Sequence, residues 1–169
     1  MQIVAAGVTD VGQTREHNED SFCILPEFDL YIVADGMGGH RAGDVASRMA
    51  THTIASFFQA TAKEDATWPF HFDPHLTIEE NRLITGIRVA NKRIYETSSR
   101  HREVHGMGTT VVGALVSRER NRMYFAHVGD SPPAGRAKPQ AAPAASDKNA
   151  IIAQAAQTAV SSALADLFG

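Results

Sequence analysis

The sequence predicts an α+β fold in which short apolar strands lie before and after two amphipathic helices. Short apolar runs in the first part of the chain end at turn signals, as strands do. Two stretches in the middle repeat apolar residues at the helical period. Two further apolar runs follow, joined by a polar turn. At 169 residues the chain is long enough to bury a core within one domain.

The first group of predicted strands occupies the N-terminal part of the chain. Residues 2–9 have the composition of a strand, and a turn follows at 10–13. Two shorter strands are expected at 21–25 and 30–34, separated by a turn that contains Pro26.

A helical period begins at Asp44, after a glycine-rich loop. The expected buried face of this first helix consists of Val45, Ala46, Met49, Ile54, Phe57 and Phe58. After a loop at 62–75, Thr77 and Glu80 have the spacing of a capping box, which predicts the start of a second helix. Its expected inward residues are Leu83, Ile84, Ile87, Ala90, Ile94 and Tyr95.

The last predicted strands are at 109–116 and 122–128, with a polar turn at 118–121 between them. From residue 132 the composition changes abruptly. Residues 132–146 read as a linker rich in proline and alanine, and residues 147–169 as a terminal amphipathic helix. That helix is either a loosely docked end of the chain or a surface for a partner.

Composition excludes several classes of protein. A net charge of −3 argues against a nucleic-acid-binding protein, which usually carries a basic surface. Cys23 is the one cysteine, so an intrachain disulfide is impossible. The first residues lack the pattern of a signal peptide, and no apolar run is long enough for a membrane span. We therefore expect a cytoplasmic protein without nucleic-acid or membrane partners.

Acidic residues gather where the predicted strands begin and end. Glu19 and Asp20 precede one strand, Asp35 follows the next, and Asp130 follows the last. Such oxygen ligands suit hard divalent cations. The alternative is that each aspartate only caps a turn.

The glycine-rich loop at 35–43, with the sequence DGMGGHRAG, invites a nucleotide-binding interpretation. It does not fit the dinucleotide fingerprint, because Arg41 stands at the third glycine position, and it lacks the lysine of a P-loop. The glycines are better explained by close approach of the backbone to another group, such as a metal that takes a carbonyl oxygen.

Four motifs occur in order: R-x-x-N-E-D, VADGMGGHRAGDVAS, GMGTT and HVGDS. Together they resemble those of bacterial type 2C protein serine/threonine phosphatases, the PPM family, over about residues 4–131. The resemblance implies a β-sandwich of two antiparallel sheets with flanking helices, assigned here to a domain at 1–131. It also implies Mn²⁺ or Mg²⁺ ions held between the sheets, two or three in the family.

The resemblance assigns metal-binding roles to particular residues. Asp35 would bridge two metals, while the Gly36 carbonyl and Glu19 would reach one of them. Asp130 would hold a further metal, and Asp20 would lie behind the direct ligands. The metals would activate a water for attack on phosphorus.

The same resemblance predicts two catalytic residues. Arg15 would hold the phosphate of the substrate through its planar fork of donors, and His40 would donate a proton to the leaving alkoxide. The substrate would be a phosphorylated protein, modified by a bacterial serine/threonine kinase.

The resemblance stops after HVGDS. Residues 132–169 contain Asp147 and Asp166 but no counterpart of the family's later aspartate motifs. We therefore expect a partial β-sandwich, incomplete at its C-terminus, that binds fewer metals and has impaired or absent activity. Association through the terminal helix or exposed sheet edges is expected. Two alternatives stay open: a non-catalytic module that binds phosphoproteins or a partner, and a remnant that folds poorly.

Overall fold

The computed structural model describes residues 3–11, 13, 17–38, 42–62 and 67–129. The elements within these ranges are β1 (Asp20–Leu25), β2 (Leu30–Met37), α1 (Ala42–Ala60), α2 (Ile78–Arg100), β3 (Gly108–Thr109), β4 (Val111–Ser117) and β5 (Arg122–Val128). Short 3-10 helices occupy Pro26–Phe28 and Arg102–Val104. Arg15, His40, Asp130, the linker at 132–146 and the helix at 147–169 lie outside the described residues. The predictions made for them therefore stay predictions.

The strands form one antiparallel sheet in the order β1-β2-β4-β5, and β3 pairs with β2. Val33 lies opposite Val112 in β4, and Gly36 lies opposite Thr109 in β3, so the register is the same on both sides of the break between β3 and β4. Within the described residues β1 and β5 are the outer strands.

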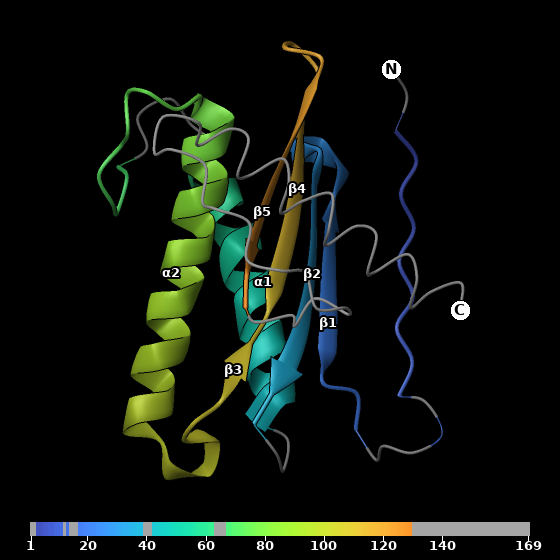
Figure 1. The fold of residues 1–169 in the computed structure, drawn as a ribbon, viewed down its shortest axis with the longest axis vertical. Helices are drawn as coiled ribbons and strands as arrows, with labels where there is room; N and C mark the ends of the chain where they lie inside the picture. Colours follow the sequence, from blue (N-terminus) through green and yellow to red (C-terminus); the bar gives the residue numbers. More distant parts are fainter. Residues whose placement is uncertain (1–2, 12, 14–16, 39–41, 63–66, 130–169) are drawn as a thin grey trace, which may run out of the picture.

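Both helices lie on one side of the sheet, as Figure 1 shows. Alternation along the strands turns one set of side chains toward them. Leu30, Ile32 and Ala34 of β2 are fully or almost fully buried there, against Ile54 and Phe58 of α1. Two helices on one face of an antiparallel sheet confirm the predicted α+β class.

The second helix starts where the sequence predicts. The Thr77 side chain accepts a hydrogen bond from the Glu80 backbone N–H, and the Glu80 carboxylate accepts one from the Thr77 N–H. Of the residues expected inward, Tyr95 is instead 72% exposed. It follows the buried Ile94 by about 100° around the helix, which carries it past the edge of the buried stripe.

Residues 3–9 form no strand, so the prediction of a strand at 2–9 is wrong. Val4 and Val8 are 85% and 87% exposed. The segment meets the sheet from the side opposite the helices, where the Gly7 backbone lies against the ring of Phe22. Strand-like composition is insufficient without a neighbouring strand to complete the backbone hydrogen bonds.

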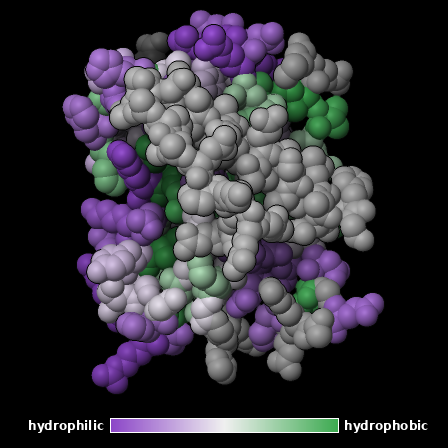
Figure 2. All heavy atoms as spheres, viewed as in Figure 1, coloured by the Kyte–Doolittle hydropathy of each residue, from purple (hydrophilic) through white to green (hydrophobic). Residues whose placement is uncertain are grey.

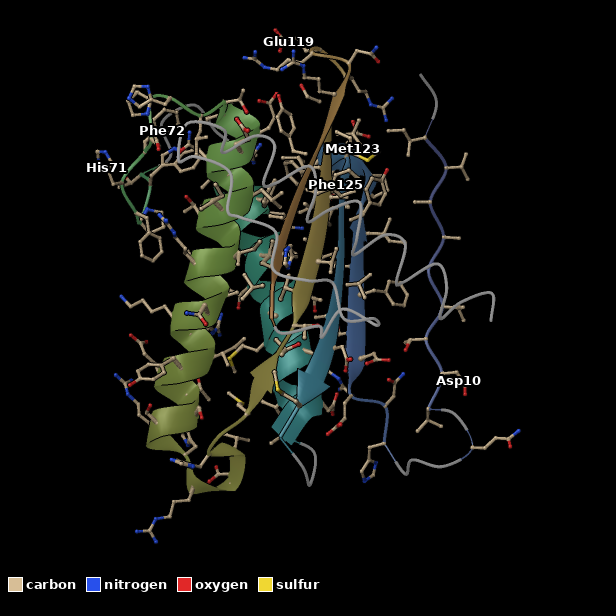
Figure 3. The ribbon with its side chains drawn as sticks, in the orientation of Figure 1. Asp10, His71, Phe72, Glu119, Met123 and Phe125 are labelled. Atoms are coloured by element: carbon tan, nitrogen blue, oxygen red, sulfur yellow. The ribbon has the colours of Figure 1, made fainter. Side chains whose placement is uncertain are left out.

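The face of the sheet turned away from the helices is apolar too. Phe22 pairs with Val33, and Ala114 pairs with Phe125 on this face. Figure 3 shows the side chains of Met123 and Phe125 on the side away from α2. Apolar residues on both faces are typical of a sheet that lies between two layers.

An aromatic cluster joins the two helices at the end of the sheet nearest the β1–β2 turn. The guanidinium carbon of Arg82 lies 4.7 Å from the ring centre of Phe58 and 5.5 Å from that of Phe28. Arg82 also donates a hydrogen bond of 2.9 Å to the Phe58 carbonyl. This arginine therefore fixes α2 against α1 by stacking as well as by hydrogen bonding.

The β1–β2 turn is connected to the β4–β5 turn by a charge pair. Arg118 donates to both carboxylate oxygens of Asp29, at 2.5 and 2.6 Å, and this hydrogen bonding lowers the pKa of Asp29. Beside it, Glu79 accepts a 2.6 Å hydrogen bond from Ser117 and lies 3.5 Å from Arg120. Burial by itself raises the pKa of Glu79. The hydrogen bond from Ser117, together with smaller contributions that include the charge of Arg120, outweighs this effect, so the pKa is lowered. Figure 2 shows this end of the molecule as hydrophilic.

Neither described helix combines the length and apolar character that crossing a membrane requires.

Candidate functional site

The opposite end of the sheet, where β1 begins and β2 ends, brings together four of the predicted site residues. Antiparallel pairing places the start of one strand beside the end of the other. Asp20 lies directly opposite Asp35, and the Gly36 N–H donates a 3.1 Å hydrogen bond to the Glu19 carbonyl. The hydrogen-bonded register therefore continues beyond the strand to the pair of Glu19 and Gly36.

Asp20 and Asp35 place two carboxylates on the same face of the sheet. Directly opposite residues of an antiparallel pair point to the same side, and like charges at such positions are destabilising. Both residues are exposed. A cation bound between or beside two such carboxylates would offset their repulsion.

Glu19 points the other way, toward the start of α1. A Cβ on Gly43 would lie 2.8 Å from the Glu19 carboxylate oxygen Oε1 and 2.8 Å from the Gly36 carbonyl carbon. Glycine at 43 therefore leaves the space that the Glu19 carboxylate occupies. The first turn of a helix is also where a negative charge is electrostatically favoured.

Gly36 is equally constrained. A Cβ there would lie 2.1 Å from the Gly43 carbonyl oxygen and 2.7 Å from the Glu19 carbonyl oxygen. Three backbone segments, at the start of β1, the end of β2 and the start of α1, thus meet where no side chain fits. The prediction of a close backbone approach at this loop agrees with the geometry, although the group approached is another part of the backbone.

Thr109 in β3 and Thr110, the residue after it, both contact the Asp35 carbonyl. The Thr109 hydroxyl donates to the Asp35 carbonyl at 2.9 Å, and the Thr110 N–H donates to the same oxygen at 2.8 Å. The Thr110 side chain lies against Gly129, where a Cβ would approach its Cγ2 to 2.7 Å. From the sequence we interpreted Thr109 and Thr110 only as strand residues. The GMGTT motif was the signal that could have shown their contact with the site.

The donors fit a hard divalent cation in kind, because carboxylates and a backbone carbonyl are the oxygen ligands that Mg²⁺ and Mn²⁺ accept. Within the described ranges, however, no group of three or more His, Cys, Asp or Glu residues could hold a metal ion. Glu19, Asp20, Asp35 and Gly36 lie together at this end of the sheet, but they do not form such a group by themselves. Arg15, His40 and Asp130 lie outside the described residues, so the structure does not place them relative to this end of the sheet.

A shallow groove of about 340 Å³ adjoins the site on its β3 side. Met37, Tyr95, Met107, Thr109 and Val128 are among the residues that line it. Met37, Tyr95 and Val128 expose much of their apolar surface.

Comparison with known proteins identifies a family and several relatives that this chain resembles. The model of the protein phosphatase 2C family matches residues 12–166. The serine/threonine phosphatase stp of Listeria monocytogenes is 38% identical over 131 residues, which are 73% of this chain and 46% of that protein.

Solved structures of two phosphatases are also similar to this chain. Stp1, the serine/threonine phosphatase of Staphylococcus aureus, has a TM-score of 0.56 at 35% identity and matches 73% of this chain and 45% of its own. The catalytic domain of the phosphatase PstP, in complex with two manganese ions, has a TM-score of 0.55 at 30% identity and matches 72% of this chain and 45% of its own. The chain spans about half the length of the curated relatives it matches.

Proposed function

The chain belongs to the protein phosphatase 2C family, and we propose that Glu19, Asp35 and Gly36 form part of a metal-dependent site that hydrolyses phosphoserine and phosphothreonine in proteins. The observation that carries this proposal is the meeting of β1, β2 and α1 at these residues. The manganese-bound family neighbour supports metal dependence.

In this proposal the oxygen ligands come from two adjacent strands. Asp35 and the Gly36 carbonyl belong to the end of β2, and Glu19 directly precedes β1. Asp20, opposite Asp35, adds negative charge and can accept hydrogen bonds from water beside the metal. When bound, divalent ions supply a water activated for attack on phosphorus. Mn²⁺ and Mg²⁺ both suit such oxygen ligands.

Three residues outside the described ranges complete the proposal. Arg15 binds the phosphoryl oxygens, because its guanidinium offers paired donors in one plane. Asp130 holds a further metal ion, and His40 donates a proton to the departing serine or threonine oxygen. The substrate is a phosphorylated protein, the product of a bacterial serine/threonine kinase. The apolar groove beside Thr109 accommodates the residues that flank the phosphorylated side chain.

The first test is metal binding by the 169-residue chain. Calorimetric titration with Mn²⁺ should show binding that Asp35→Ala weakens by more than the roughly 10–100-fold that partners behind the ligands usually cost. Asp29→Ala, at the other end of the same two strands, is the matched control and should bind Mn²⁺ like the parent chain. Equal affinity in the parent and Asp35→Ala would exclude Asp35 as a ligand.

The second test is chemistry. A chimera joins residues 1–131 to the remaining part of the Listeria relative and is supplied with a phosphothreonine peptide. We expect Mn²⁺-dependent release of phosphate that falls at least about 100-fold in Asp35→Ala and in Arg15→Ala, because each removes charge stabilisation at the phosphoryl group. Turnover that survives both substitutions would contradict the proposed function.

A further inference from the structure

The peptide unit between Asp35 and Gly36 is held from both sides. Its carbonyl oxygen accepts from the Thr109 hydroxyl at 2.9 Å and from the Thr110 N–H at 2.8 Å. Its N–H donates to the Glu19 carbonyl at 3.1 Å. Because the peptide unit is planar, fixing both its polar groups fixes the direction in which the Asp35 side chain leaves the backbone.

We propose that Thr109 is a positioning residue for metal binding by Asp35 and Gly36, an inference that rests on the proposed function. The ladder of β2 and β3 requires only the Thr110 N–H at the Asp35 carbonyl. The Thr109 hydroxyl is an additional donor from a side chain, and it comes from a residue 74 positions away in the sequence. It acts on the ligands through the backbone and does not itself touch the metal.

The hydroxyl is suited to orient the peptide more than to hold the fold. It also lies 2.8 Å from the Thr110 carbonyl, and one hydroxyl proton cannot serve both acceptors fully at once. Without the hydroxyl, the Asp35 carbonyl keeps its bond from the Thr110 N–H. Replacing Thr109 should therefore cost little stability, while loosening the tilt of the peptide that carries Asp35.

The two threonines contact two segments that are distant in the sequence. Thr109 and Thr110 bind the Asp35–Gly36 peptide, and the Thr110 side chain packs on Gly129, the residue before Asp130. Gly129 has φ of +127°, a conformation that strongly favours glycine. The short segment thus holds the backbone of Asp35 and Gly36 directly and contacts the backbone at Gly129.

The test compares Thr109→Val, which keeps the shape and loses the hydroxyl, with Thr109→Ser, which keeps the hydroxyl. Thr61→Val is the control. The Thr61 hydroxyl, which directly follows α1, donates a 2.7 Å hydrogen bond to the Phe57 carbonyl within that helix. Calorimetry should show Mn²⁺ affinity about 10-fold lower in Thr109→Val, within the range for partners that orient ligands. Thr109→Ser should bind within about 3-fold of the parent chain, and Thr61→Val should bind equally well.

Amide hydrogen exchange without metal gives an independent measure. In Thr109→Val the Gly36 amide should exchange about 10-fold faster than in the parent, while amides in the core of β2 should keep their protection. A Thr109→Val chain with unchanged Mn²⁺ affinity and unchanged Gly36 exchange would overturn the proposal. So would equal losses in Thr109→Val and Thr109→Ser.

The two proposals fail in different ways. If the parent chain binds Mn²⁺ and Asp35→Ala does not, but Thr109→Val binds like the parent, the proposed function stands and the positioning role is refuted. If the parent chain binds no Mn²⁺, the proposed function fails, and the positioning role toward a metal fails with it, whatever the exchange of Gly36 shows.

Discussion

The two ends of the β1–β2 pair carry aspartates in contrasting surroundings. At the turn end, Asp29 receives two hydrogen bonds from Arg118, and Glu79 lies beside Ser117 and Arg120. At the open end, Asp35 lies directly opposite Asp20. In the first case the fold supplies positive partners for its carboxylates. In the second it places two carboxylates directly opposite each other, a local conflict of the kind that proteins keep mostly at functional sites.

The backbone around these aspartates differs as well. Asp29 adopts a φ of +50° in a half-buried turn, a conformation that short polar side chains tolerate. Asp35 stands beside Gly36, where three backbone segments meet. The turn end is therefore held together by side-chain ion pairs, whereas the open end is held by close contacts between backbone segments.

The largest expected effect tests that rigidity. Gly36→Ala places a Cβ 2.1 Å from the Gly43 carbonyl oxygen, a backbone atom that cannot rotate away. We expect a loss of unfolding free energy of about 3 kcal/mol or more. Urea unfolding followed by the fluorescence of Trp68, the one tryptophan in the chain, measures it.

Gly108→Ala is the control for that change, because Gly108 lies opposite Met37 in the same ladder and a Cβ there would meet only side-chain atoms at 3.6 Å or more. It should shift the unfolding free energy by less than about 1 kcal/mol. Similar losses in both variants would show that the crowding at Gly36 relaxes easily.

The next largest effect is the stabilisation by Mn²⁺, which should depend on Asp35 at the open end and not on Asp29 at the turn end. Mn²⁺ at 100 times its dissociation constant should stabilise the parent chain by about 2.7 kcal/mol, since it binds the folded state. Mn²⁺ should stabilise Asp29→Asn by the same amount, although that variant is less stable without metal. Mn²⁺ should stabilise Asp35→Asn only slightly. Thermal melting with and without Mn²⁺ measures both. A metal response that depended on Asp29 would place the binding site at the wrong end.

Without metal, the two aspartates should have opposite effects on stability. Asp35→Asn removes the repulsion from Asp20 and should raise the unfolding free energy by about 0.2–1 kcal/mol. Asp29→Asn weakens the bonds from Arg118 and should lower the melting temperature. If both substitutions destabilise the metal-free chain, the contrast between the ends is not one of charge.

The smallest effect is the dependence on pH. The pKa of Asp29 is lowered by the hydrogen bond from Arg118, so its folded pKa lies below its unfolded value. The stability it contributes is therefore complete above the unfolded pKa, about 4, and is lost as the pH falls through the lower folded pKa. Melting temperatures of the parent and Asp29→Asn should converge as the pH falls from 5 toward 2. If the difference between the two melting temperatures stayed constant with pH, the charge of Asp29 would not account for the stability it contributes.

Much of the fold could be predicted from local sequence. The capping box at Thr77 and Glu80 marked the start of α2, and the turn at 118–121 marked the β4–β5 hairpin. The segment at 3–9 could not be predicted correctly, because strand formation depends on a neighbouring edge that local composition does not reveal.

The gathering of Glu19, Asp20 and Asp35 at one end of the sheet was predictable because these residues border strands. Nothing in the sequence singles out Gly43, and at Thr109 it predicts only a strand. Their importance depends on contacts between distant segments, the Gly43 backbone with the Glu19 carboxylate and the Thr109 hydroxyl with the Asp35 carbonyl. Single-residue patterns carry no information about such encounters.

The register of the sheet has a consequence for the order in which the molecule assembles. The β1–β2 and β4–β5 hairpins close through short turns, so each can form early and by itself. Thr109 reaches Asp35 only after the chain has closed a loop of 74 residues that includes both helices, and contacts of such separation form slowly. We therefore expect the acidic end to be among the last regions to take shape during folding. A newly made chain could therefore contain both hairpins before its acidic end has formed.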